Sequence, residues 1–251
     1  MIKFFRKIRQ KLLSENKFSK YLIYAIGEIV LVVIGILIAL QINNWNESKK
    51  TALEEQALLK DLQIDLLLNH EQLKDKQEHL LRVQTNTKIL ANDYLNKELN
   101  QQMILRADSL VGLLQSRATF DPNEGIVNEL ISSGKLRSLE NKELRNFLSA
   151  WTSNIQEIKE NEGRLQIITH KLRDYLNSKY SYADLYEASS VLKFPEGRTN
   201  FPSDRQDIFN DIEFENYISR LSRSRSLLLY RLEGFEGKLS EVLKVLESEI
   251  E

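Results

Sequence analysis

The chain has no cysteine, three prolines and nine glycines among its 251 residues. Without cysteine there are no disulfides and no thiolate chemistry, so the core must be held by packing alone. The scarcity of proline and glycine argues against the many tight turns of a β-sandwich. Together with abundant Leu, Glu, Lys, Asn and Ser, it predicts long helices and an all-α fold.

Recognisable catalytic and metal-binding patterns are also missing. The sequence contains neither a Gly-x-Ser-x-Gly motif nor a glycine-rich phosphate loop. Of the three histidines, His70 and His79 are nine residues apart, which places them on opposite sides of a helix, and no histidine follows a Glu at three residues' distance. We therefore expect no enzyme activity, no metal site and no cofactor.

One long apolar run stands out at residues 21–42, YLIYAIGEIVLVVIGILIALQI, interrupted only by Glu28 and Gln41. A helix of this length spans the hydrocarbon layer of a bilayer, about 30 Å thick. Trp45 follows the run where an indole would anchor in the interface. A cleaved signal peptide would have a shorter apolar core ending in small residues, so we expect an uncleaved transmembrane helix.

Charge is distributed unevenly around this run. Residues 1–20 carry seven Lys or Arg and one Glu, with apolar residues at helical spacing between them, whereas residues 47–251 have a net charge of −6. Cationic flanks stay in the cytoplasm, and a basic amphipathic arm suits a lipid surface. The expected domains are a cytoplasmic arm over 1–20, a transmembrane helix over 21–42 and a periplasmic domain over 43–251, anchored in a bacterial inner membrane. The acidic outer domain argues against a nucleic-acid partner.

The transmembrane helix carries a distinct face formed by Glu28, Val32, Gly35 and Ala39. Gly35 and Ala39 form a small-xxx-small pair, which allows two helix backbones to approach closely. We interpret this face as a contact with another copy or another membrane protein, with Glu28 hydrogen-bonding across it. Two alternatives stay open: Glu28 reaches the cytoplasmic interface or local water, or it couples to a proton or an ion.

The outer domain is predicted to be an antiparallel bundle of three long helices near 49–94, 140–178 and 207–249, with shorter helices between them. In the first helix, Asn69 and Lys76 occupy positions that the apolar stripe would make apolar. A short helix over 126–133 is expected to end at Gly134, with Glu140 or Asn141 capping the next one. Residues 179–206 are expected to form a loop or two short turns.

Three arginines gather in the last predicted helix, in the stretch SRLSRSRS. Arg220, Arg223 and Arg225 could grip an anionic ligand or the carboxylates of a partner. Alternatively, they balance the many acidic residues of the outer domain.

The stretches GEIVLVVIGILIALQINNWNE near the N-terminus and ELISSGKLRSLENKELRNFLSAW at 129–151 resemble a family of uncharacterised single-pass proteins of Gram-negative inner membranes. The resemblance is close over residues 1–50 and looser beyond. It implies a cytoplasmic N-terminus and a helical periplasmic domain, and it brings no activity, ligand or catalytic residue.

Taken together, the sequence favours a membrane-anchored helical module that acts by protein–protein contact, as a scaffold or an accessory subunit of an envelope complex. Its expected partners are the lipid bilayer and either further copies of itself or another envelope protein. The alternative is a sensory or ligand-binding domain that signals through a separate partner, since the arm of some 20 residues is too short for an output domain. An envelope enzyme is the third class.

Overall fold

In the computed structural model, residues 18–117, 119–188 and 205–250 are described, and all the regular structure in these ranges is helical. The predicted all-α fold is confirmed. The chain divides into two compact units, residues Met1–Leu58 and Leu59–Glu251. The predicted basic arm lies almost wholly outside the described residues.

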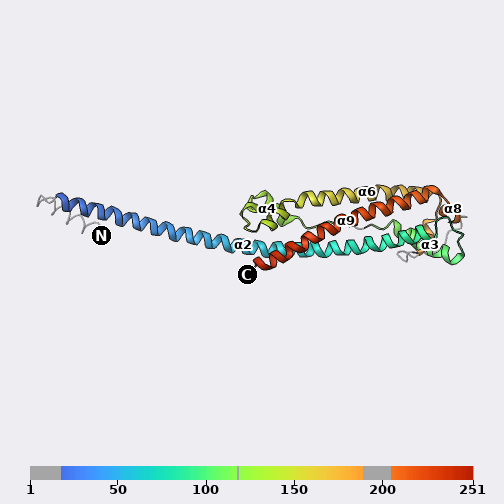
Figure 1. The fold of residues 1–251 in the computed structure, drawn as a ribbon, viewed down its shortest axis with the longest axis horizontal. Coiled ribbons are helices and arrows are strands. Elements are labelled where there is room, and N and C mark those ends of the chain that lie inside the picture. The colour runs from blue at the N-terminus through green and yellow to red at the C-terminus, as the bar shows by residue number, and fades with distance from the viewer. Residues whose placement is uncertain (1–17, 118, 189–204, 251) are drawn as a thin grey trace. The chain divides into compact units, whose positions relative to one another are not determined.

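The long helix α2, Phe18–Asp93, contributes to both units. In the second unit it is followed by α3 (Gln101–Leu114), α4 (Gly125–Ser132), the 3₁₀ turn η1 (Lys135–Ser138) and α5 (Lys142–Ser149). Then come α6 (Trp151–Asn177), α7 (Tyr182–Ala188), α8 (Arg205–Phe209) and α9 (Ile212–Glu249), as Figure 1 shows.

Helix ends follow the expected capping chemistry. Gly134, just after α4, has φ +75°, a left-handed conformation that costs glycine little. Asn141 caps α5 by accepting hydrogen bonds from the backbone N–H groups of Glu143 and Leu144. The predicted helix over 140–178 is thus two helices, α5 and α6. Asp211 likewise caps α9, so the last long helix begins at Ile212 rather than near residue 207.

Helix direction in the second unit follows from side-chain contacts. Ser240 and His70 pair at one end of the α2–α9 contact, and Arg225 and Thr87 pair further along, so the two helices are antiparallel. Helix α9 also runs antiparallel to α6, beside which it lies in Figure 1. Helices α2 and α6, however, run in the same direction, because α3 and the extended residues 119–124 already bring the chain back along α2.

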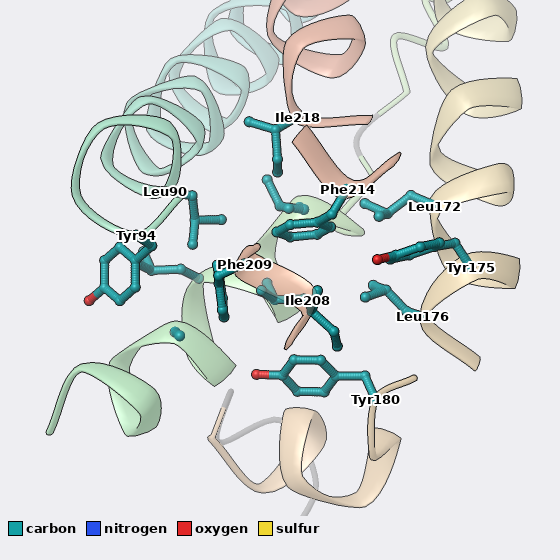
Figure 2. Packing of buried hydrophobic residues seen from close by; sticks show 14 of the residues in the cluster. Leu90, Tyr94, Leu172, Tyr175, Leu176, Tyr180, Ile208, Phe209, Phe214 and Ile218 are labelled. Atoms are coloured by element: carbon teal, nitrogen blue, oxygen red, sulfur yellow. The ribbon is translucent and has the colours of Figure 1, made fainter. Parts of the chain in front are cut away.

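The core of the second unit is built from the predicted apolar stripes. In Figure 2, side chains of α2, α6, α8 and α9 converge, with Phe209 and Phe214 at their centre (ring centroids 5.5 Å apart, edge to face). A second aromatic group lies around Phe235, whose ring centroid is 5.5 Å from Trp151 and 5.8 Å from Phe147. Tight packing of this kind explains how the core does without disulfides.

The sequence predicts a loop or two short turns over residues 179–206. Their first part contains the short helix α7, and residues 189–204 lie outside the described residues. Arg205, at the start of α8, donates hydrogen bonds to Asp108 of α3 at 2.9 Å and to Asp184 of α7 at 2.5 Å. Both carboxylates are buried, so this arginine ties three short elements together at one end of the bundle.

Candidate functional site

The first candidate site is the apolar part of α2 that lies in the first unit. This is the one helix in the described ranges long and apolar enough to cross a membrane, and none of the residues in its apolar window is buried. Val32 is 56% exposed, Gly35 and Ala39 are also exposed, and Glu28 is partly covered. A Cβ atom built on Gly35 would meet nothing within 4 Å. The four predicted packing residues therefore share one helix face that is open to a partner.

Trp45, the predicted interface anchor, is 64% exposed. The ammonium of Lys49 lies 5.6 Å from the centroid of its ring, one helical turn further along. This cation–π contact keeps an indole and a positive charge together, a combination suited to the headgroup region of a bilayer.

The three predicted anion-binding arginines do not form one site. Arg220 and Arg223 are exposed on α9, whereas Arg225 is 2% exposed in the core. The Arg225 guanidinium donates to Thr87 Oγ1 at 2.8 Å and to the Leu114 carbonyl at 2.6 Å. The three arginines therefore do not reach one anionic ligand or partner together. Arg225 continues the apolar spacing of α9, and its position there was the signal of its burial.

Arg225 instead lines the second candidate site, a cavity of about 310 Å³ in the second unit. The cavity lies between α2, the chain after α3, α6 and the middle of α9. Its wall combines four cations, two carboxylates, two histidines, neutral hydrogen-bonding groups and an apolar side: Arg117, Lys159, Arg173, Arg225, Asp121, Glu162, His79, His170, Gln115, Ser116, Thr119, Gln166, Thr169, Gly163, Leu80, Val83, Leu165 and Leu228.

A buried polar network holds the wall of this cavity in place. Lys76, 2% exposed on α2, forms an ion pair with Glu162 of α6. The same carboxylate accepts a hydrogen bond from the backbone N–H of Phe120 at 3.0 Å. Two turns away on α2, Asn69 donates to the Asn123 carbonyl at 2.9 Å and accepts from the Asn123 N–H at 2.7 Å. The two polar interruptions in the predicted apolar stripe thus fix the extended segment against α2.

The wall of the cavity carries more cationic than anionic side chains, and burial shifts the pKa values of groups in and beside it. Burial lowers the pKa of Lys76, with the Glu162 carboxylate opposing it. Burial, and then the charges of Arg82, Arg225 and Lys76, lower the pKa of His79. Burial alone lowers the pKa of Arg225 to about 10. Each of these shifts reflects a charge that is costly to keep in this part of the bundle.

His70 and His79 contact different parts of the second unit, in agreement with their nine-residue spacing. His79 and His170 both line the cavity, while His70 contacts Glu236 and Ser240 of α9. Both contacts of His70 use Nε2, at 2.7 Å to the Glu236 carboxylate and 3.1 Å to Ser240 Oγ. A Ser-His-acid triad needs the two ring nitrogens to face different partners, so this trio does not have that geometry. No group of three or more potential metal ligands occurs in the described ranges.

The comparisons with known proteins support the family resemblance. The model of a Family of unknown function (DUF6090) matches residues 28–220, more than half of the chain. The chain belongs to this family. Comparison with curated proteins and with solved structures finds no match.

The DUF6090 match covers most of both candidate sites. It begins at Glu28, at the start of the packing face, and includes the cavity wall from His79 to Arg173. It ends at Arg220, before Arg225. The sequence reasoning missed the cations that line the cavity, Arg117, Lys159 and Arg173, because nothing in their spacing shows that the fold brings them together.

Proposed function

We propose that this chain is a membrane-anchored helical module that works by contact with another protein of the cell envelope. The arm before residue 21 would lie in the cytoplasm, and the second unit in the periplasm of a Gram-negative bacterium. The observation that carries the proposal is the uncovered apolar part of α2. Water would penalise so large an exposed apolar surface, whereas lipid covers it without cost.

The small side chains on one face of α2 support a contact with another protein. Lipid alone would be satisfied by large apolar residues all round, as at Ile34, Ile36 and Leu37. Gly35 and Ala39 instead leave a shallow strip on which a second helix can pack with close backbone contact. The partner that best fits such a strip is another helix with a similar face, and a second copy of this chain provides one.

The second unit adds a smaller exposed apolar surface. On α2, Ile64, Leu67 and Leu68 are 56%, 50% and 56% exposed, although Leu66 beside them is fully buried. Adjacent exposed leucines and isoleucine on a helix are suited to a modest protein contact. This surface supports the same proposal for the bundle.

The absence of cysteine makes the proposal directly testable in native membranes. Ala39→Cys places a thiol on the packing face, and Leu37→Cys places one on the opposite face of the same helix. Under a mild oxidant, we expect Ala39→Cys to form a disulfide-linked adduct, either a dimer of the chain or a conjugate with a partner. Leu37→Cys should form much less. Equal crosslinking of both variants, or none from either, would overturn the proposed contact.

The same background tests the compartment. Ser248→Cys, exposed near the end of α9, should react with a membrane-impermeant maleimide once the outer membrane is permeabilised, without lysis of the inner membrane. Labelling that requires inner-membrane lysis would place the bundle in the cytoplasm and reverse the orientation.

A further inference from the structure

The cavity of the second unit has properties that a merely structural gap does not need. At about 310 Å³ it is at the small end of the range for small-molecule sites. Its wall carries four cations against two carboxylates, inside an outer domain whose net charge is −6. The positive charge is therefore concentrated against the trend of the surrounding domain.

The carboxylates of the wall already have partners. Glu162 forms an ion pair with Lys76 and accepts from the Phe120 N–H. Asp121 accepts a hydrogen bond from Thr119 Oγ1 at 2.5 Å. The cations differ: within the described ranges, Lys159 pairs with Glu124, but Arg117, Arg173 and Arg225 have no carboxylate within ion-pair distance. The wall thus holds three guanidinium groups that form no ion pair within the described ranges.

Arg225 makes this imbalance costly. Its side chain is 2% exposed, and its two recorded hydrogen bonds go to a hydroxyl and a backbone carbonyl, both uncharged. A buried charge without a counter-charge is normally replaced by an apolar residue or neutralised by an acid. A guanidinium kept charged beside a cavity is instead suited to an anion that enters from solvent.

We infer that this cavity binds a small organic anion whose carboxylate or phosphate group contacts Arg225, Arg173 and Arg117. Planar guanidinium groups form paired hydrogen bonds to both oxyanion types. Thr169 and Gln166 provide neutral hydrogen-bonding groups for hydroxyls of the ligand, and Leu80 and Leu228 cover its carbon skeleton. The inference rests on the bundle alone and is independent of the proposed membrane contact.

The test is a thermal-unfolding measurement on the full chain in a non-ionic detergent. The probes are inorganic phosphate, glycerol 3-phosphate and succinate, each compared with sodium chloride at equal ionic strength. A ligand well above its Kd stabilises the state that binds it. We expect at least one probe to raise the Tm by about 3 °C or more above the chloride baseline. The two phosphates and the dicarboxylate distinguish the oxyanion types. No gain from any probe would overturn the inference.

Substitutions of the cavity arginines test whether the rise in Tm comes from binding in the cavity. Arg117 and Arg173 are both exposed, so the double variant Arg117→Gln/Arg173→Gln should fold normally and lose the probe-specific gain in Tm. Its matched control removes the same charge from Arg220 and Arg223, which lie on α9 outside the cavity, and should keep the gain. Loss in both double variants would show a response to overall charge, and loss in neither would show that Arg117 and Arg173 do not bind the probe; either result would overturn the inference.

A second pair of variants leaves every charge in place. A Cβ built on Gly163 of the cavity wall meets nothing within 4 Å, and neither does one on Gly237, which is outside the wall. Gly163→Leu should fill the cavity and abolish the gain in Tm, while Gly237→Leu should retain it. A full gain in Gly163→Leu would mean that the anion binds elsewhere.

Discussion

Helix α2 offers a comparison within a single element. In its first part, residues 22–42, almost every side chain is apolar and none is buried. In its second part, residues 59–93, a single stripe is buried, and that stripe includes polar residues such as Asn69 and Lys76. Apolar content and burial therefore run in opposite directions along one helix. The first part is long and apolar enough to span a membrane, whereas the second part is patterned to pack on one side against other helices of its unit.

The largest expected effect comes from breaking the buried ion pair. Glu162→Ala leaves the buried Lys76 ammonium without the carboxylate that it contacts, and also removes the acceptor of the Phe120 N–H. We expect the free energy of unfolding to fall by about 3–5 kcal/mol. Urea unfolding in detergent measures it, with fluorescence of the buried Trp151 as the signal in a Trp45→Phe background.

Its control replaces both charges at once. Lys76→Met/Glu162→Met removes the pair without stranding a buried charge, so it should cost clearly less than the single change. A single variant that loses less than about 1 kcal/mol would mean that this polar contact does not hold the extended segment.

A smaller loss of unfolding free energy is expected from Leu→Ala substitutions, which should act differently in the two parts of α2. Leu66 is fully buried in the second unit, and Leu66→Ala should cost about 2–5 kcal/mol. Leu37, 57% exposed in the apolar part, should tolerate the same change within about 0.5 kcal/mol. The same urea experiment compares them. Similar losses at the two positions would mean that the Leu37 face of the apolar part is also packed against protein.

Much of the fold could be predicted because it rests on local rules. The apolar stripe of α2, the break at Gly134 and the cap at Asn141 depend on spacing and on short-range backbone geometry. The parallel direction of α2 and α6 could not be predicted. It depends on the return of residues 119–124 along α2, which Asn69 and Lys76 secure through contacts with residues far away in sequence.

The cavity was harder to predict from the sequence than the fold. Arg225 looked like one of three clustered cations, yet its neighbours Arg220 and Arg223 face outward. Its place in the apolar spacing of α9 was visible, but Thr87 and the Leu114 carbonyl, which accept its hydrogen bonds, are more than a hundred residues away. The local pattern shows that a charged residue occupies an apolar position, and only the tertiary contacts show which groups it binds.

The smallest expected effect is on the pH dependence of the unfolding free energy, and it arises in the second unit, at Asp211. Hydrogen bonds from Lys179, Tyr175 and the Glu213 N–H lower the pKa of Asp211 to about 2, from an ordinary 3.8. A lowered pKa in the folded state stabilises the protein above the unfolded value, and this contribution is lost as pH falls from about 4 to about 2. Asp211→Asn keeps a capping side chain but removes the charge. It should therefore flatten the fall in unfolding free energy over this range, as measured by urea unfolding at a series of pH values.

The control for this experiment is Asp207→Asn, at an exposed carboxyl of α8, which should leave the slope of unfolding free energy against pH unchanged. Equal slopes in the wild type and both variants would show that Asp211 does not contribute to the pH dependence.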